Sequence, residues 1–460
     1  MSWYHALRKP PCERESREPA VSGRSESDLR EDAERILRAA IEATDAERLV
    51  ESCLRRRFED SARPRRVRMA GFGVAASSMA RGVVSVLGDG IREGVLVVPA
   101  GQAAEAPVPG GAVDIFEGGL GLPDPGGAAG AAAIRQLALQ LSADDLLIGL
   151  VSGGGSSLLT LPPEGMPLED VREVIRMLRE AGAAGDEIAR VATHLDALKG
   201  GRLAAAAAPA RVLALVLCDR PEEDRDAVAS GPFAPPRSTF RDAVEVLRRY
   251  ELWSCVPLAV RGYLDRGRCG EIGGPAREGD ACFGRVEALT VGSGHTAAGA
   301  ACALASDRGY EAQVLTTGLA GPAREAGAFL AEAARTLVAR RGAGQGPSCV
   351  ISAGAPERSC RGSGPGGPAL ELALAAALEM DPARPALLVS MSSSGLDGEG
   401  GAAGAVVTSD TLLRAHEAGF DCARALERGE AHEVFDALDD VIVSGPTGTD
   451  VGAVQVLLLP

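Results

Sequence analysis

The run Val151-Ser-Gly-Gly-Gly-Ser-Ser-Leu-Leu159 constrains the fold of this chain more than any other segment. The largely apolar stretch 145–151 has the length of a buried strand, and glycines and serines follow it at once. Backbone N–H groups in such a turn are not obstructed by Cβ atoms, and serine hydroxyls add donors, so the segment predicts a phosphate or carboxylate cradle. The alternative is a tight strand-to-helix turn with glycine at positive φ and no ligand. The candidate binding residues are Ser152, Gly153, Gly154, Gly155, Ser156 and Ser157.

A second segment, His194-Leu-Asp-Ala-Leu-Lys-Gly-Gly-Arg-Leu-Ala204, contains Lys199, and the only other lysine in the chain is Lys9. A lysine ammonium is a compact charge that suits phosphate in a way that the planar arginine fork does not copy. We therefore interpret Lys199 as a candidate catalytic cation, with His194 and Arg202 as candidate phosphate- or substrate-binding residues. The alternative is a solvated cation at a helix end.

Composition limits the possible partners. The formal net charge is −15 with a pI near 5.0, which argues against nucleic acid or an anionic membrane as a partner. No apolar run is long enough for a membrane span. The ten cysteines include no CxxC pair, and we find no secretory leader, so we expect reduced thiols in a cytoplasmic protein. The sequence leaves the oligomeric state open, a homodimer included.

The order of apolar runs and glycines predicts an α/β fold with two domains. Residues 1–27 are polar and are interpreted as a disordered tail. Residues 28–264 begin with helical spacing and then alternate short apolar runs with helical stretches, which is typical of a parallel sheet covered by helices on both faces. The Gly/Pro-rich stretch 265–285 is a candidate linker, and the alternation restarts over 286–460 as a smaller α/β domain.

Asp219 follows the apolar run 212–218, so we expect it at the carboxyl end of a strand. A carboxylate beside a phosphate cradle suits Mg²⁺, which prefers one or two carboxylates together with phosphate oxygens. Asp219 is therefore a candidate catalytic residue and metal ligand. The alternative is a solvated acidic loop, and for Glu222 and Glu223 this is the better interpretation.

Together these segments resemble the glycerate 2-kinase family, the two-domain type with a C-terminal MOFRL domain. The SGGGSALL motif of the family is matched at 152–159, its HLSxxKGGRLA motif at 194–204, and its ASGP motif at 229–232. Its GPTGTNV motif is matched at 445–451, and a DG…AAG match is seen at 397–404. The five matches occur in the order of the family and extend over most of residues 28–458.

The resemblance implies a Rossmann-like N-terminal domain and transfer of the ATP γ-phosphoryl group to the 2-hydroxyl of D-glycerate. It implies ATP and Mg²⁺ as cofactors, a small anionic substrate, and a site in the cleft between the domains. It also implies further site residues in the C-terminal domain, at Glu371, Asp397, Thr447, Thr449 and Asp450.

The departures from the family fall on residues that would do chemistry. The GKAA lysine is Val74, the GHPxPD histidine is Leu120, and the VRKHLS run reads Val191-Ala-Thr-His-Leu-Asp196. The GGRNQE run reads Gly366-Gly-Pro-Ala-Leu-Glu371, and TDGTDG reads Ser393-Ser-Gly-Leu-Asp-Gly398. Removing one cation that stabilises transferring phosphate lowers the rate by orders of magnitude.

Two hypotheses follow from the sequence. In the first, the chain is an ATP-dependent kinase for glycerate or a related small hydroxy acid, in which arginines replace the lost cations. In the second, it is a catalytically impaired paralogue that binds a small anion or nucleotide, or that serves as a partner subunit. A site lined by several arginines would favour the kinase.

Overall fold

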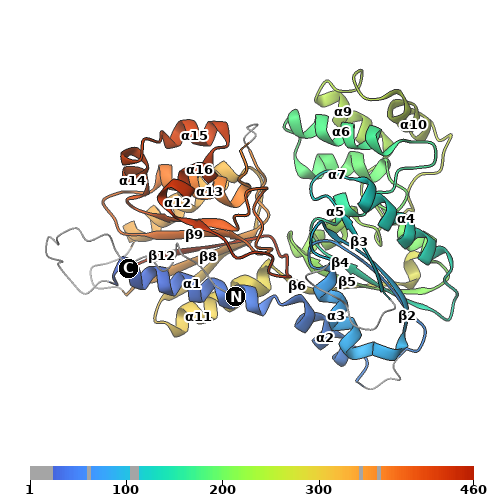
Figure 1. Ribbon diagram of the computed structural model, residues 1–460, viewed down its shortest axis with the longest axis horizontal. Helices are drawn as coiled ribbons and strands as arrows, with labels where there is room; N and C mark the ends of the chain where they lie inside the picture. The colour runs from blue at the N-terminus through green and yellow to red at the C-terminus, as the bar shows by residue number, and fades with distance from the viewer. Residues whose placement is uncertain (1–23, 60–63, 104–112, 341–345, 360–363) are drawn as a thin grey trace. The chain divides into compact units, whose positions relative to one another are not determined.

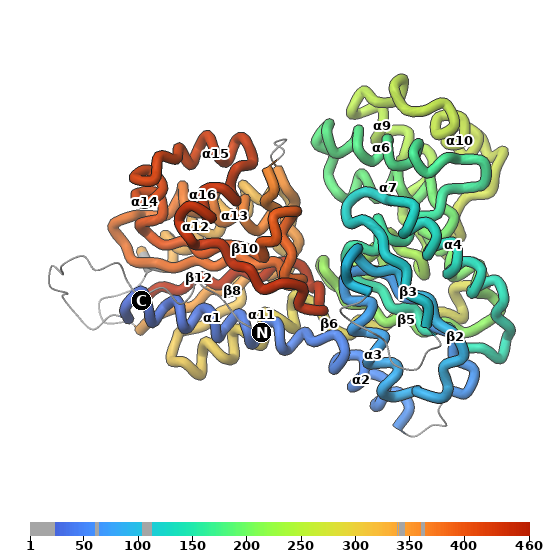
Figure 2. The backbone as a smooth tube through the Cα atoms, in the orientation of Figure 1, coloured from blue at the N-terminus to red at the C-terminus, as the bar shows by residue number. Residues whose placement is uncertain are grey.

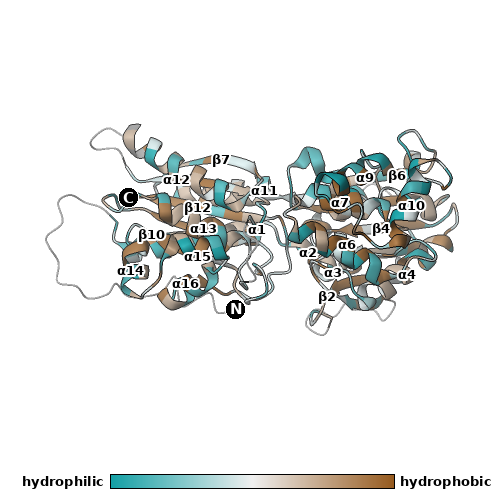
Figure 3. Ribbon diagram, turned by 90° about the horizontal axis from the view of Figure 1, so that it is seen from above, coloured by the Kyte–Doolittle hydropathy of each residue, from teal (hydrophilic) through white to brown (hydrophobic). Residues whose placement is uncertain are grey.

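The computed structural model describes residues 24–59, 64–103, 113–340, 346–359 and 364–460. The chain divides into two compact units, one formed by Met1–Thr44 with Ser293–Pro460 and the other by Asp45–Gly292. Each unit contains one six-stranded sheet with helices on both of its faces (Figure 1). Hydrophobic residues gather around the strands inside each unit, and hydrophilic residues lie on the outer helices (Figure 3). The predicted α/β fold is confirmed.

The unit Asp45–Gly292 contains a parallel sheet in the order β3-β2-β1-β4-β5-β6. Its strands are β1 (Val67–Phe72), β2 (Ile91–Pro99), β3 (Val113–Gly118), β4 (Leu146–Val151), β5 (Arg211–Cys218) and β6 (Val286–Ser293). Its α-helices are α2 (Ala46–Arg57), α3 (Ala76–Leu87), α4 (Pro125–Leu139), α5 (Gly155–Leu158), α6 (Leu168–Glu180), α7 (Gly185–His194), α8 (Arg202–Ala207), α9 (Phe240–Arg249) and α10 (Leu258–Arg268). The 3₁₀ segments in the described part of this unit are η2 (Gly88–Gly90), η3 (Glu222–Ser230) and η4 (Phe283–Arg285).

The strand order identifies where this unit can bind a ligand. β1 pairs in parallel with β2 on one side and with β4 on the other, although β4 is not the next strand in the chain. The order therefore reverses between β1 and β4, and open α/β sheets bind ligands at such a switch point, outside the carboxyl ends of the strands. Gly73 follows β1 and Ser152 follows β4, so the Gly-rich segment lies at this point.

Two hydrophobic clusters support the switch point. One lies between the sheet and helices α4, α5 and α8, and it includes Phe72, Leu147 and Ile134, all of which are buried. The other joins α6, α7, α9 and α10 in a helical layer of their own, with Leu178, Leu195 and Leu247 in its centre. The segment from α5 to α10 thus adds a second core beside the carboxyl edge of the sheet (Figure 1).

The other unit contains a mixed sheet in the order β11-β10-β9-β12-β8-β7. β7 pairs with β8 in parallel, and the pairs from β8 through β12, β9 and β10 to β11 are antiparallel. Its strands are β7 (Glu311–Leu319), β8 (Ser348–Gly354), β9 (Leu387–Ser392), β10 (Gly404–Thr408), β11 (Val441–Ile442) and β12 (Ala453–Leu459). Its helices are α1 (Glu26–Ala43), α11 (Gly294–Asp307), α12 (Ala323–Arg340), α13 (Pro368–Glu379), α14 (Thr411–Glu417), α15 (Cys422–Arg428) and α16 (Ala431–Leu438).

Helix α1 belongs to the unit that holds the C-terminal half of the chain. Ser25 and Asp28 form a capping box at its start, and Leu29, Ile36 and Leu37 lie on its buried face. α1 packs against α11 and β12, and Figure 2 shows this blue segment beside the orange and red elements. Leading helices were predicted from the spacing of apolar residues, but their separation into two units was not.

The division of the chain differs from the predicted domain bounds. β6 pairs beside β5 in the first sheet, so the unit Asp45–Gly292 continues through the predicted linker 265–285. The predicted tail 1–27 lies outside the described residues up to residue 23, and Glu26 already begins α1. None of the helices in the described residues is long and apolar enough to cross a membrane.

A buried ion-pair network ties α1 to the C-terminal elements. Arg30 donates to Asp440 at 3.2 Å, and Arg414 donates to the other oxygen of the same carboxylate. Asp440 is fully buried and Arg30 is nearly so. Burial raises the pKa of Asp440, and the two guanidiniums oppose that effect.

Asp440→Ala should destabilise this unit by roughly 3 kcal/mol, because it removes the buried carboxylate that Arg30 and Arg414 share, although Arg30 keeps its pair with the exposed Glu26. Urea unfolding followed by far-UV circular dichroism measures the change in the free energy of unfolding. Asp436→Ala, an exposed position on the neighbouring helix α16, is the matched control and should change stability by less than about 0.5 kcal/mol. Equal effects of the two substitutions would contradict a stabilising role for the network.

Candidate functional site

The Gly-rich loop (residues 152–157) is held against the turn that follows β1. The Ala75 N–H donates to Ser152 Oγ at 3.1 Å, and the Val74 N–H donates to the Gly153 carbonyl at 2.9 Å. A Cβ on Gly73, whose φ is 119°, would lie 2.2 Å from Ser152 Oγ, so only glycine fits there. The two turns of the switch point therefore form one rigid piece.

Two backbone donors of the Gly-rich loop remain available to a ligand. Within the described part of the chain, neither the Gly153 N–H nor the Gly154 N–H has a hydrogen-bond partner. Gly154 is in the left-handed region with a φ of 76°, and it precedes the single turn of α5. Buried backbone donors are normally paired, so the free N–H of the buried Gly153 fits an anion-binding role.

The serines of the Gly-rich loop divide into structural and available hydroxyls. Ser152 Oγ is used by Ala75, and Ser157 Oγ donates to the Gly154 carbonyl at 3.0 Å while accepting from the Gly121 N–H at 3.1 Å. Ser156 Oγ lies 3.0 Å from Ser230 Oγ, and either hydroxyl can donate in this hydrogen bond. Ser156 is half-buried, whereas Ser230 is buried. The predicted cradle is thus brought together, with Ser156 as its most available hydroxyl.

Apolar side chains flank the Gly-rich loop where the resemblance implies a lysine and a histidine. A Cβ built on Gly154 would lie 2.8 Å from Leu120 Cδ2 and 3.1 Å from Val74 Cγ2. Val74 is 8% exposed and Leu120 is 43% exposed. Both substituted positions therefore border the cradle itself, and neither brings a charge to it.

Lys199 is buried, and its ammonium is fully engaged inside the protein. Its Nζ donates to Thr160 Oγ1 at 2.9 Å and to Asp196 Oδ2 at 3.0 Å. Thr160 Oγ1 in turn donates to the Ser156 carbonyl at 3.1 Å, so Lys199 is connected to the Gly-rich loop through the Thr160 hydroxyl. In this structure Lys199 is a positioning residue for the loop, since its ammonium faces no open space.

Lys199→Met should destabilise the unit Asp45–Gly292 by roughly 3 kcal/mol, because the Asp196 carboxylate would remain buried without a counter-ion. Chemical unfolding of the whole chain measures this loss. The double variant Lys199→Met/Asp196→Asn removes the uncompensated charge and should recover part of it. If Lys199→Met were as stable as the wild type, the buried ion pair would have no structural role.

Asp219 lies directly after β5, at the carboxyl edge of the sheet, as predicted. Its Oδ1 atom is buried and has no hydrogen-bond partner in the described structure. Burial raises the pKa of this carboxyl group, and the neighbouring Arg220 opposes the effect. Asp219 follows β5, the neighbour of the strand that precedes the Gly-rich loop. An orphaned buried oxygen at this edge fits a carboxylate that meets a cation when a phosphate ligand is bound.

His194 and Arg202 are drawn into the protein interior. His194 is buried, its Nε2 lies 3.1 Å from Ser238 Oγ, and its ring packs against Phe240 at 4.8 Å. The Arg202 Nη1 donates to the carbonyls of Thr193 and Lys199 at 3.0 and 3.2 Å. His194 Nδ1 and Arg202 Nη2 are buried without partners among the described residues. Burial, helped by Arg202, lowers the pKa of His194 to about 4.

Acidification should lower the folding stability, because the buried imidazole of His194 resists protonation. His194 is neutral in the folded state down to about pH 4, whereas the unfolded chain binds its proton near pH 6.5, so stability falls as pH falls through this window. Between pH 7.5 and pH 5 the loss from His194 amounts to about 2 kcal/mol. Comparing unfolding free energies of wild type and His194→Gln at the two pH values isolates it. A difference between the two proteins that does not change with pH would contradict the shifted pKa.

The predicted C-terminal residues Asp397 and Glu371 cluster at the start of α13. Asp397 is buried and accepts from the N–H groups of Ala369 and Leu370 at 3.0 and 2.8 Å, so it caps the helix from another segment. Burial raises the pKa of Asp397 to about 6, and these backbone hydrogen bonds oppose the rise. Glu371 Oε2 accepts from the Ser359 N–H at 2.9 Å, and its Oε1 is buried without a partner in the described region.

Thr447, Thr449 and Asp450 shape the last turn of the chain. Thr447 Oγ1 donates to the Ser393 carbonyl at 2.5 Å, and Thr449 Oγ1 donates to the Thr44 carbonyl at 2.6 Å. Asp450 Oδ1 accepts from the Gly452 N–H at 3.3 Å. The hydroxyls of both threonines are thus used to fasten the turn, and the contact to Thr44 fastens it to the end of α1.

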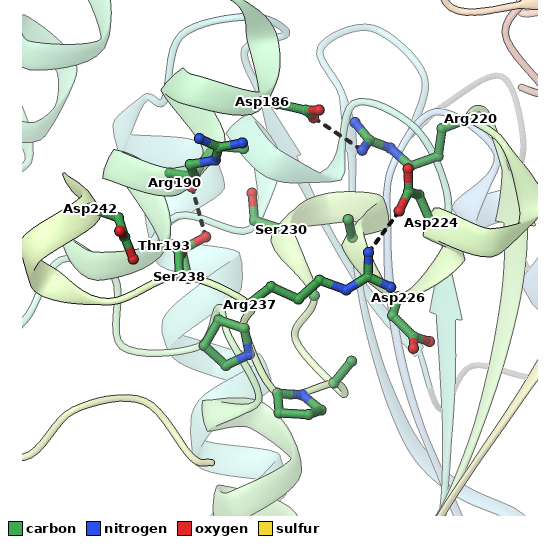
Figure 4. Close-up of a pocket in the computed structure, with 16 residues that line it drawn as sticks. Asp186, Arg190, Thr193, Arg220, Asp224, Asp226, Ser230, Arg237, Ser238 and Asp242 are labelled. Carbon is green, nitrogen blue, oxygen red and sulfur yellow. Dashed lines mark hydrogen bonds and ion pairs between the residues drawn. The ribbon is translucent and has the colours of Figure 1, made fainter. Parts of the chain in front are cut away.

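A pocket beside the Gly-rich loop was not predicted from the sequence. We call it the Arg190 pocket; it measures about 340 Å³ and lies between α7, η3 and the segment 231–238 (Figure 4). Three arginines line it, namely Arg190, Arg220 and Arg237. Four aspartates line it too, namely Asp186, Asp224, Asp226 and Asp242. Ser230, the partner of Ser156, belongs to its wall.

Most of the charge in the Arg190 pocket is already paired. Arg220 donates to Asp186 at 3.1 Å, and Arg237 crosses to Asp224 at 3.0 Å (Figure 4). No group of three or more His, Cys, Asp or Glu side chains in the described residues is arranged to hold a metal ion. The sequence signal that could have located this pocket is the charge alternation around Ser230, but the helix α7 that closes it lies about forty residues earlier.

The sheet order, the switch-point loop and its two N–H groups without partners among the described residues define an α/β protein with a candidate anion site at the carboxyl edge of a parallel sheet. Residues 32–265 match a family described as a domain of unknown function (DUF4147), and residues 348–453 match the MOFRL family.

Individual relatives extend this match. D-glycerate 2-kinase from Thermotoga maritima is 33% identical over 90% of this chain and 95% of its own length. A putative hydroxypyruvate reductase from Agrobacterium vitis is 35% identical over 85% of this chain and 98% of its length. A crystal structure of glycerate kinase from Thermotoga maritima aligns with a TM-score of 0.75 at 31% identity, covering 94% of this chain and 99% of that one. The chain belongs to the glycerate 2-kinase family.

Proposed function

We propose that this chain binds a nucleotide and a small hydroxy acid at its Gly-rich edge, and that it transfers phosphate far more slowly than a glycerate 2-kinase with the lysine and histidine of the family. The binding half of the proposal is supported by the free N–H groups of Gly153 and Gly154 and by the Ser156 hydroxyl. Such donors suit the phosphates of ATP. A kinase relative makes ATP the expected donor.

Asp219 is the residue that would hold Mg²⁺ when it arrives with the nucleotide. Its orphaned buried Oδ1 is suited to a cation, and Mg²⁺ commonly uses only one or two protein carboxylates beside phosphate oxygens. When bound, the ion would neutralise charge on the phosphates. The residues of the chain would bind and orient the phosphate through Gly153, Gly154 and Ser156.

The proposal of slow phosphate transfer rests on the apolar side chains that border the cradle. Val74 and Leu120 stand within van der Waals reach of Gly154, at the positions where the resemblance implies a lysine and a histidine. Phosphoryl transfer depends on fixed charges that meet the charge spreading over the phosphate in the transition state. The aliphatic side chains of Val74 and Leu120 supply no such charge.

The ion pair of Lys199 supports the same conclusion. The family motif has a serine where this chain has Asp196, and the Asp196 carboxylate binds the Lys199 ammonium at 3.0 Å. Because both groups are buried, the lysine charge is neutralised within the fold rather than offered to a ligand.

An active kinase is the second candidate, favoured by the three arginines of the Arg190 pocket. Arg190, Arg220 and Arg237 line the pocket whose wall includes Ser230, the hydrogen-bond partner of Ser156 in the Gly-rich loop. Two of the three are held by aspartates, however, and the four aspartates outnumber the arginines. This balance makes the pocket a poor replacement for cations at the transferring phosphate.

Val74→Lys/Leu120→His should raise phosphate transfer from ATP to D-glycerate by at least about 10-fold, because it returns charge to the cradle border. Radiolabelled ATP transfer at high protein concentration measures the rate, and calorimetry measures ATP affinity of both proteins. Leu139→His, at an exposed leucine on α4, is the control and should not change the rate.

Each half of the proposal can fail separately. Transfer by the wild type at ordinary kinase rates, on the order of 1–100 per second, would refute slow transfer and favour the second candidate. Failure of both proteins to bind ATP in the presence of Mg²⁺ would refute the binding half.

A further inference from the structure

We infer that the Arg190 pocket binds a polyhydroxy monocarboxylic acid of five or six carbons, rather than the three-carbon glycerate. The inference deepens the proposed function by naming the substrate class, and it rests on that function only for the role of the ligand as acceptor. Binding itself requires neither ATP nor the Gly-rich loop.

The size of the pocket is the first argument. Its volume is about 340 Å³. This volume lies near the lower end of the range for small-molecule pockets, which leaves room for a ligand of on the order of a dozen non-hydrogen atoms. Glycerate has about half as many, so it would leave much of the pocket to water.

The charges of the pocket select a singly charged ligand. Arg220 and Arg237 are fixed by Asp186 and Asp224. Arg190 is exposed on α7 and has no ion pair within 4 Å among the residues that the structure describes, although its charge contributes to lowering the pKa of Asp242 in the same pocket. One guanidinium is therefore available for one carboxylate. Polyphosphates would meet more carboxylates than guanidiniums, so the nucleotide is a poor ligand for this pocket.

The remaining wall suits hydroxyl groups on a carbon chain. Paired arginines and aspartates present donors and acceptors side by side, and each hydroxyl of a polyol can donate to a carboxylate and accept from a guanidinium. Ala189, Ala234, Pro235 and Pro236 supply apolar surface for the C–H groups of such a ligand. A short acid would use the guanidinium but not this wall.

The position of Ser230 connects the pocket to the Gly-rich loop. Ser230 lines the pocket, and its Oγ lies 3.0 Å from Ser156 Oγ. Figure 4 shows Arg190 and Asp242 on one side of the pocket, Asp224 and Asp226 on the other, and Ser230 between them. A ligand held by its carboxylate at Arg190 could therefore direct a hydroxyl past Ser230 toward the loop.

Calorimetric titration of the full chain without nucleotide tests the inference, using D-gluconate, D-glycerate, sorbitol and inorganic phosphate as probes. We expect D-gluconate to bind at least tenfold more tightly than each of the other three. Arg190→Gln should weaken gluconate binding about tenfold and leave sorbitol binding unchanged. Arg135→Gln, an exposed arginine on α4 outside the pocket, is the matched control and should bind gluconate like the wild type.

Several results would overturn the inference. Glycerate or phosphate binding as tightly as gluconate would show a plain anion site, and sorbitol binding as tightly would show that no carboxylate is recognised. Unchanged gluconate affinity in Arg190→Gln would remove the pocket from the explanation, while unaltered thermal unfolding of this variant confirms that it is folded. Gluconate binding to a protein that neither binds ATP nor transfers phosphate would refute the proposed function and leave this inference standing.

Discussion

The close approach of Gly73 to Ser152 is the constraint on which the candidate site depends. The turns after β1 and β4 interlock through two hydrogen bonds, and no side chain fits between them at Gly73. This contact fixes the direction of the Gly153 and Gly154 N–H groups without any ligand. It also fixes what can act on a bound anion, because the residue after Gly73 must lie at the border of the cradle. Val74 occupies that place, so the rigid turn that directs the two N–H groups also places an uncharged side chain at the border of the cradle.

The parallel sheet and the position of the Gly-rich loop could be predicted from the sequence because both depend on local patterns. Apolar runs of strand length followed by glycines identify carboxyl ends of strands, and the glycines report backbone conformations that other residues avoid. The burial of the Lys199 side chain could not be predicted in the same way. Its scarcity marked it as unusual, but one of its partners, Thr160, lies 39 residues away, so its burial is a property of the assembled fold.

The placement of α1 and the Arg190 pocket could not be predicted either, because both depend on residues that lie even farther apart in the sequence. The helical spacing of α1 predicts a buried face but not which sheet buries it, and the answer depends on Asp440, 410 residues away. The Arg190 pocket combines α7 with η3 and the segment after it, and its arginines are ordinary surface residues in the sequence. Charged side chains at helical spacing are usually solvated, so nothing local distinguishes a pocket from an exposed face.

Several residues that match the family and two that depart from it have different roles in the structure. Gly73, Ser152, Lys199 and Asp397 match, and each one holds a turn, a loop or a helix end in place. Retention of these residues is explained by the fold alone, and so it is not evidence of catalysis. Val74 and Leu120 depart from the family, and both border the cradle without supporting any part of the fold through a hydrogen-bonding side chain. A chain still under demand for glycerate kinase chemistry would be expected to show the opposite distribution, with charge kept at the cradle and variation tolerated in its supports. Asp196 also departs from the family, but it supports the fold through its ion pair with Lys199. Slow transfer is therefore favoured by the two departures that border the cradle, Val74 and Leu120.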